Sequence, residues 1–439
     1  MEVKRTIIFS ALLVAMTVIA AGTAAAGWIV AATTDYETGN TAIMNTDTGV
    51  FDGNALGHSD QDISVVARGG YIYFIEKSLG AISKYDPARL AKKDMVYQYS
   101  VGAGTNPYDI VFVSDTLAYV IRYGSSSILA INPEARDQAS FAGNEIDISM
   151  FDSAGVPEAV AGYYHDGVVY VVLQRLNGWT ADKSGLLVAV DAATGTLIDY
   201  DPIAEGIQGC ELLVRNPQNI SAADGELFIS GHVWGEQTEG IMGINLVDGF
   251  RNVTQRMVLD EESLGMDLTG VSVIGNGRGI CYSSGWIQDN LGAWIQVGAA
   301  YWFDTVAGAL GDVLPVPTPG GSAVLAEGIV YVASRDDSAP GLYSVDPATN
   351  TLYSSPFITT LPPTVVVYCG EGDPILVEND TMPSVFNLGK PYPNPFNPST
   401  VVSFETSGPG HVFAEVYNVL GQRVDRKSTR LNSSHRIRS

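Results

Sequence analysis

The sequence has little cysteine and little charge. Only three cysteines occur among 439 residues, and charged residues make up 16% of the chain. Cys210, Cys281 and Cys369 are too few and too scattered for a disulfide framework or a zinc site, although one disulfide between two of them stays open. Lys and Arg number 24 against 48 Asp and Glu, which gives a net charge of −24. An acidic chain of this kind does not fit nucleic acid as a partner, because phosphates require clustered cations.

Catalytic motifs are also absent from the sequence. The chain contains no G-x-S-x-G, H-E-x-x-H, P-loop or C-x-x-C pattern, and its acidic turns lack the spacing of an EF-hand loop. His58, His165 and His232 fall in separate parts of the chain, and His411 and His435 lie near its end. We therefore predict no catalytic residues and no metal site, and the sequence identifies no cofactor.

A long apolar run occurs only at the N-terminus. A basic start precedes the apolar run from Ile7 to Ala21, and Ala24 and Ala26 follow in A-x-A spacing. This pattern is typical of a secretory signal peptide, and the run is shorter than the ~20 residues of a membrane span. We expect residues 1–26 to be removed, no transmembrane span, and a protein that is secreted or placed on the cell surface.

The body of the chain repeats a short turn that follows an apolar, strand-like run. Seven copies begin with Asp or Asn, at separations of 41, 46, 59, 54, 59 and 42 residues. They begin at Asn45, Asp86, Asn132, Asp191, Asn245, Asp304 and Asp346. An Asp or Asn side chain can cap its own turn, and a later Gly or Asn tolerates positive φ. Each repeat contains about four short strands, which is the size of a β-propeller blade.

The repeats resemble those of known propeller families. "LAYVIRYGSSSILAINPEAR" is similar to the repeat of YVTN-type surface propellers, and "GLLVAVDAATGTLIDY" resembles the blade motif of quinoprotein-like propellers. The resemblance implies an all-β, seven-bladed β-propeller over residues 27–375. The first repeat lacks an inner strand, and an unpaired strand at Thr364 to Cys369 follows the seventh. We predict that this strand completes the first blade, because closure removes exposed sheet edges.

A proline-rich stretch, "PYPNPFNPST", follows the propeller. Together with "STVVSFE" and "AEVYNVLGQ" it resembles the C-terminal sorting domain of type IX secretion substrates and the immunoglobulin-like module of hook-capping proteins. The resemblance implies a linker at 376–398, a short β-sandwich-like sorting module at 399–424, and the outer-membrane secretion machinery as a partner. The family's later strands are missing, and the basic residues 425–439 have the composition of a foreign tail.

Polar side chains precede or begin several inner strands. Asp62, Asp109, Glu158 and Asn219 stand at such positions. In an antiparallel blade these positions lie on the same face as the hairpin between the second and third strands. We predict that the four side chains surround the mouth of the central channel. The alternative is that they cap strand starts and neighbouring turns.

Enlarged loops with tryptophan occur between the second and third strands of three repeats. They carry Trp179, then His232 with Trp234, then Trp286 with Trp294. A loop gains no stability from an exposed indole, so we predict that these residues form a ligand-binding surface. The alternative is that each Trp packs between blades.

Two functions remain compatible with the sequence. The favoured one is an exported binding propeller that captures an unidentified extracellular small molecule, glycan or protein on the tryptophan-bearing and acidic face. The alternative is a propeller enzyme, either a quinoprotein-like oxidoreductase or a polysaccharide-active enzyme. A quinoprotein would need a Trp-floored cofactor pocket and a Ca²⁺ site, and only the turns "DAATG" and "DPATN" resemble its blade motif.

Overall fold

The backbone divides into two units, Ala26–Glu378 and a second one made of Met1–Ala25 with Asn379–Ser439. The computed structural model describes residues 27–223, 225–288 and 294–370, with the side chains of 286–288 and 294–296 excepted, and the backbone of short strands outside these ranges.

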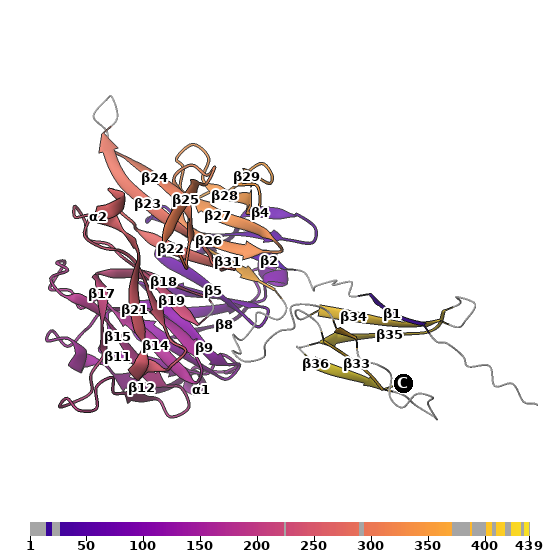
Figure 1. The fold of residues 1–439 in the computed structure, drawn as a ribbon, viewed down its shortest axis with the longest axis horizontal. Helices are drawn as coiled ribbons and strands as arrows, with labels where there is room; N and C mark the ends of the chain where they lie inside the picture. Colours follow the sequence, from indigo (N-terminus) through magenta and orange to yellow (C-terminus); the bar gives the residue numbers. More distant parts are fainter. Residues whose placement is uncertain are drawn as a thin grey trace, which may run out of the picture. The chain divides into compact units, whose positions relative to one another are not determined.

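Within the described residues, the first unit is a seven-bladed β-propeller, as predicted. Figure 1 shows its sheets arranged around a common centre. Blade 1 has the strand order β31 (Pro363–Cys369), β2 (Trp28–Thr34), β3 (Gly39–Asn45), β4 (Phe51–His58). Blade 2 is β5 (Ile63–Arg68), β6 (Tyr71–Glu76), β7 (Ala81–Tyr85), β8 (Met95–Ser100). Blade 3 is β9 (Pro107–Ser114), β10 (Leu117–Arg122), β11 (Ser127–Ile131), β12 (Ala142–Asp147).

The remaining blades follow the same order. Blade 4 is β13 (Ala159–His165), β14 (Val168–Leu173), β15 (Ser184–Asp191), β16 (Thr196–Ile198), with β17 (Cys210–Arg215) also on β15. Blade 5 is β18 (Pro217–Ala223), β19 (Glu226–Gly231), β20 (Gly240–Asn245), β21 (Thr254–Asp260). Blade 6 is β22 (Gly270–Gly275), β23 (Arg278–Gln288), β24 (Trp294–Asp304), β25 (Ala309–Val313). Blade 7 is β26 (Pro319–Ala326), β27 (Ile329–Ser334), β28 (Gly341–Asp346), β29 (Thr351–Leu352), with β30 (Phe357–Ile358) also on β28.

Short helical turns connect some of the outer strands. They are η1 (Pro87–Lys92), α1 (Gln138–Phe141), η2 (Ser149–Phe151), η3 (Phe250–Asn252) and α2 (Glu261–Leu264). Asp86, Asp137 and Asp260 cap η1, α1 and α2 by accepting a backbone N–H inside each helix.

The predicted ring closure is present. β31 pairs antiparallel with β2, with Cys369 opposite Trp28. An apolar cluster lies between each pair of consecutive blades, and one of them joins blade 7 to blade 1 through Ala333, Leu342 and Ile29. The second and third strands of a blade are buried on both faces, so they form continuous apolar runs without alternation.

The repeated turns join the third strand to the fourth in every blade. In all seven copies the first side chain accepts a backbone N–H two or three residues later, as Asn45 does from Thr48 and Asp191 from Thr194. Gly195 and Asn350 end their turns at φ 67° and 53°. The turn chemistry read from the sequence is therefore confirmed.

The second unit contains two three-stranded sheets. One is β1 (Ala15–Ile19), β34 (Gly410–Tyr417), β35 (Arg423–Leu431), and the other is β32 (Asn387–Leu388), β33 (Val401–Glu405), β36 (Ser434–Arg438). β1 belongs to the predicted signal peptide, and β35 with β36 covers most of the predicted tail. The side chains of this unit and most of the linker 376–398 lie outside the described residues, so its sandwich-like packing stays a prediction.

Candidate functional site

Antiparallel pairing gives the propeller two distinct faces. We call the face with the connections between second and third strands, such as residues 174–183, the loop face. The opposite face, with the seven Asp- or Asn-capped turns, is the turn face. Trp179 and Trp234 lie in loop-face connections of the neighbouring blades 4 and 5 and are 95% and 72% exposed. These two indoles are therefore exposed in their loops and do not pack between blades.

Arg215, which the sequence did not single out, joins the two tryptophan loops. Its Nη1 donates to the Ala181 carbonyl at 3.2 Å in the Trp179 loop. Its Nη2 donates to Glu236 at 2.6 Å and its Nε to Glu239 at 2.7 Å, both in the Trp234 loop. The Arg215 guanidinium holds the pKa of Glu236 below its usual range. Only the folded arrangement of blades could reveal this contact, because arginine has no diagnostic motif here.

Glu158, another of the predicted residues, supports the loop that carries Trp179. Glu158 accepts the Leu176 N–H at 3.1 Å, at the base of the Trp179 loop. Burial raises the pKa of Glu158, with the nearby Asp152 acting in the same direction, against the opposing hydrogen bond from Leu176.

His232 lies in the Trp234 loop, next to the indole of Trp234. Its ring centroid is 6.4 Å from that of Trp234, in an edge-on arrangement, and its Nδ1 lies 3.9 Å from Glu261 Oε1. The structure thus brings His232 and Trp234 together, and it brings Glu158 to the loop that carries Trp179.

Trp286 and Trp294 lie on the paired strands β23 and β24. Their backbones are placed opposite Gln296 and Gln288. Their side chains lie outside the described residues, so their part in a binding surface stays a prediction.

The other three polar residues have partners within the protein. Asp62 forms an ion pair with Lys77 at 2.9 Å inside its own blade. The Asn219 side chain accepts a hydrogen bond from the Val271 N–H and donates one to the Val271 carbonyl. The Ser230 hydroxyl also donates to the side-chain oxygen of Asn219. The part of Asp62 and Asn219 in a ligand site stays a prediction.

Asp109 links blade 3 to blade 4 by a hydrogen bond. It accepts the Gly162 N–H of β13 at 3.0 Å and the Ile110 N–H at 2.8 Å. Burial raises the pKa of Asp109 to about 6, against the lowering effect of these two bonds. Ser221, Ser272 and Ser322 make the same kind of contact, each accepting a backbone N–H from the inner strand of the following blade. These hydrogen bonds between neighbouring blades explain why polar residues recur on the inner strands.

One alignment of side chains has the order of a hydrolase triad. Thr41 Oγ1 lies 2.8 Å from His58 Nε2, and His58 Nδ1 lies 3.6 Å from Glu76 Oε1. Thr41 is 0% exposed, and Glu76 also accepts hydrogen bonds from Ser83 and Gln98. A substrate cannot reach this hydroxyl, so the group is part of the packing between blades 1 and 2.

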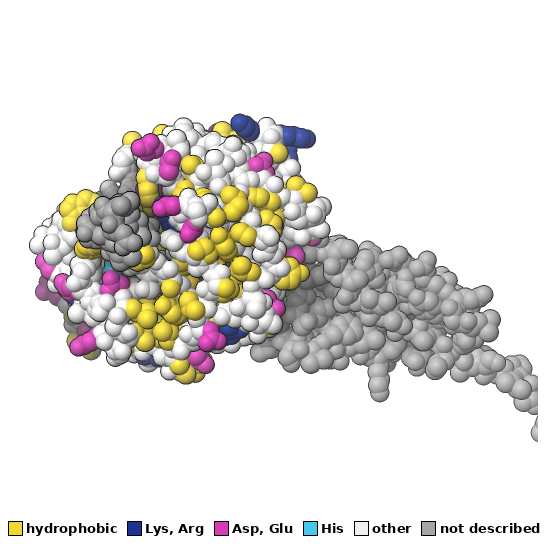
Figure 2. Space-filling view, turned by 90° about the horizontal axis from the view of Figure 1, so that it is seen from above, with side chains coloured by type: hydrophobic (Ala, Val, Ile, Leu, Met, Phe, Trp, Pro, Cys, Tyr) yellow, Lys and Arg dark blue, Asp and Glu magenta, His cyan; other side chains and the backbone are white. Residues whose placement is uncertain are grey.

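The electrostatics of the surface follow the composition. Figure 2 shows a face on which acidic side chains are scattered and Lys and Arg are few. No group of three or more His, Cys, Asp or Glu that could hold a metal occurs among the described residues. The three cysteines are buried and are not joined by a disulfide, and burial raises the pKa of the Cys281 thiol to about 12. In the described part of the chain, no helix is long and apolar enough to cross a membrane.

Comparisons with known proteins support the fold. No family model matches the chain, and no curated protein matches it in sequence. A solved structure of a putative 6-phosphogluconolactonase from Bacteroides fragilis is 12% identical with a TM-score of 0.51, covering 78% of this chain and 98% of its own. Apo AztD from Citrobacter koseri is 12% identical with a TM-score of 0.46, covering 95% of this chain and 98% of its own. At these identities the likeness concerns the propeller fold alone.

Proposed function

We propose that this protein is an exported, non-catalytic propeller that binds an extracellular small molecule, glycan or protein on its loop face. The observation that carries the proposal is the pair of exposed indoles, Trp179 and Trp234, on loops that Arg215 ties together. Exposed tryptophan has no role in folding, whereas a rigid aromatic surface is a common anchor for a ligand.

The Arg215 contacts support a preformed surface. Loops that must become ordered on binding lose affinity through the entropy of that ordering. Here a single guanidinium, 29% exposed at its side chain, spans both loops and pairs with Glu239, whose side chain is only 3% exposed. These contacts link the two loops that carry the tryptophans and so support a fixed spacing of the loops.

Export and surface sorting belong to the same proposal. The basic start, the apolar run and the A-x-A spacing support removal of residues 1–26. The resemblances to YVTN-type surface propellers and to type IX sorting domains support delivery through the outer-membrane secretion machinery. N-terminal sequencing of material recovered outside the cytoplasm tests this part, since a chain that still begins at Met1 would contradict it.

The binding face is tested with Trp179→Ala and Trp234→Ala. Full-length protein is titrated with a panel of oligosaccharides, iron chelates and extracellular proteins. We expect each variant to keep its melting temperature, because exposed substitutions change stability by about 0.5 kcal/mol or less. We expect each to weaken the binding of any member that the wild type captures by about 2 kcal/mol.

Two control variants complete the experiment. Trp302→Ala removes a buried indole that donates to Asn350 at 2.8 Å, so it should lower stability by roughly 3–5 kcal/mol. Tyr353→Ala removes an exposed ring of blade 7 and should change neither quantity. Unchanged binding in both loop-face variants, or a loss equal to that of Tyr353→Ala, would contradict the proposed surface.

A further inference from the structure

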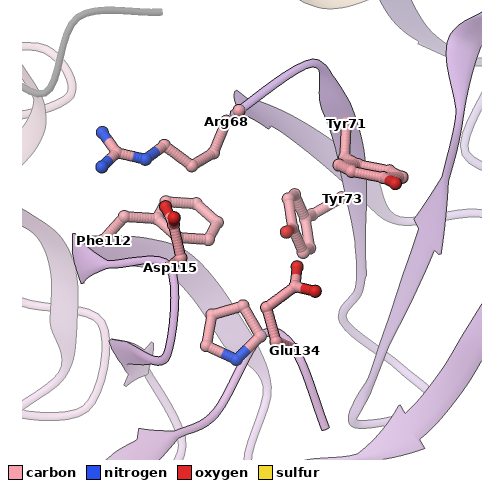
Figure 3. Close-up of a pocket in the computed structure, with 8 residues that line it drawn as sticks. Arg68, Tyr71, Tyr73, Phe112, Asp115 and Glu134 are labelled. Atoms are coloured by element: carbon pink, nitrogen blue, oxygen red, sulfur yellow. The ribbon is translucent and has the colours of Figure 1, made fainter. Parts of the chain in front are cut away.

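A pocket of about 300 Å³ lies on the turn face, opposite the tryptophan loops, between blades 2 and 3. Arg68, Phe112 and Asp115 lie on one side of it, and Tyr71, Tyr73 and Glu134 on the other (Figure 3). No sequence motif marks this pocket, because its walls come from separate repeats.

A glycine hairpin positions one wall of the pocket. Gly69 and Gly70 connect β5 to β6 with φ of 60° and 79°, values that favour glycine at both positions of a two-residue turn. The turn places Arg68 directly opposite Tyr71 in the strand register. Asp115 lies in the corresponding turn of blade 3, between β9 and β10.

A buried lysine contacts three of the side chains that line the pocket, Tyr71, Tyr73 and Glu134. Lys84 is 2% exposed, and its Nζ lies 4.2 Å from the centroid of the Tyr71 ring and 5.4 Å from that of Tyr73. The same ammonium pairs with the Glu134 carboxylate and donates to the Pro133 carbonyl at 3.2 Å. Glu134 is thereby neutralised, and the tyrosine rings are fixed by cation–π contacts.

Two charges of opposite sign remain at this pocket. Arg68 and Asp115 both line it, yet within the described part of the chain neither side chain has an ion pair or a hydrogen bond. They do not pair with each other either. A ligand that carries both an anionic and a cationic group would satisfy both side chains at once.

An apolar region adjoins these charges. A second hollow, of about 350 Å³, shares Arg68 and Phe112 with the pocket and lies at the inner strands. Its other lining residues are Val66, Ala67, Val324, Val366, Val367 and Tyr368. An apolar or aromatic group of a ligand whose charges face Arg68 and Asp115 would be removed from water there.

We propose that this turn-face pocket binds a small zwitterion with an apolar body, the chemistry of a free apolar amino acid. The Arg68 guanidinium holds the ligand's carboxylate in a two-pronged contact, and Asp115 holds its ammonium group. Phe112, which lines both hollows, packs against the body. This site is separate from the loop face, so it stands whether or not the tryptophans bind a ligand.

The test is titration calorimetry of the full chain with L-phenylalanine, L-leucine and L-tryptophan. Two single-charge analogues, 3-phenylpropanoate and phenethylamine, report on each charge separately. We expect at least one amino acid to bind, and L-phenylalanine to bind at least about tenfold more tightly than either analogue. Arg68→Gln and Asp115→Asn should each weaken the amino acid by at least about tenfold.

Controls separate this site from folding and from the loop face. Thermal melting should show both variants folded, because the two side chains lie at a surface turn, and Trp179→Ala should leave amino-acid binding unchanged. The proposal is overturned if no amino acid binds at millimolar concentration. It is equally overturned if the single-charge analogues bind as well as L-phenylalanine, or if folded Arg68→Gln and Asp115→Asn bind it like the wild type.

Discussion

Replacing Asp109 with Asn should stabilise the propeller at neutral and alkaline pH. The carboxylate is partly buried beside the junction of blades 3 and 4, and desolvation there raises its pKa to about 6 from a usual 3.8. Asn219 stands at the equivalent third position of β18, where its amide accepts from Val271 N–H and donates to the Val271 carbonyl. An asparagine side chain in place of Asp109 can make the same pair of bonds to Gly162 without placing a charge in this partly desolvated position.

The magnitude follows from the difference between the two pKa values. A folded-state pKa about 2 above the unfolded one corresponds to about 3 kcal/mol. Because the folded state binds the proton more tightly, this stabilisation of the wild type is complete below about pH 4 and is lost as the pH rises through about 6. The amide of the Asp109→Asn variant does not titrate, so the variant should exceed the wild type by about 3 kcal/mol at pH 8 and by nothing near pH 4.

The assay is thermal melting of both proteins from pH 4 to pH 8. For a unit of this size we expect a gap of roughly 4 °C at pH 8 that closes on acidification. Turn carboxylates such as Asp191 and Asp304 have pKa values that are lowered by backbone hydrogen bonds. Their protonation in acid should therefore lower the stability of both proteins equally. Asp115→Asn, an exposed change in the same blade, is the control and should give no gap. A gap that is independent of pH, or a variant less stable at pH 8, would refute the reasoning.

Two further predictions concern closure and the tryptophan loops. Ending the chain before Pro362 removes β31 and exposes sheet edges, so this truncation should aggregate, which light scattering would measure. Ending the chain before Asn387 should leave the propeller folded. Equal melting of the two truncations would argue against closure by β31. Arg215→Met leaves Glu239 buried without its partner and should lower stability by about 3 kcal/mol in chemical denaturation. The same variant should weaken the binding of any ligand that the wild type captures on the loop face, because the two loops lose their link, and an unchanged stability would show that Arg215 does not couple the loops.

The blades could be predicted because their signals are local and repeated. An Asp or Asn that caps its own turn, such as Asp191, depends only on residues two or three positions away. The closing strand was predictable for a related reason, since the first repeat was short by one strand. For Trp179 and Trp234 the sequence left exposure and packing between blades open, and the structure shows both indoles exposed.

The roles of Asp109 and Asn219 could not be predicted in the same way. Both bond to backbone groups of the next blade, about fifty residues later in the chain, and no sequence pattern records which backbone groups a neighbouring blade presents. The turn-face pocket was missed for the same reason, because Arg68 and Asp115 meet only when two repeats stack side by side.

The pairing of β2 with β31 sets the order in which the chain can fold. Thr364 donates to the carbonyl of Ala32, which lies 332 positions earlier. Bringing these segments together costs about 2.5 kcal/mol more in chain entropy than closing a 20-residue connection. Blade 1 cannot be completed until Cys369 has been synthesised. One edge of β2 therefore stays unpaired while the sequence of the six other blades is synthesised. The ring can therefore close only after the whole propeller sequence, from β2 to β31, is available to fold.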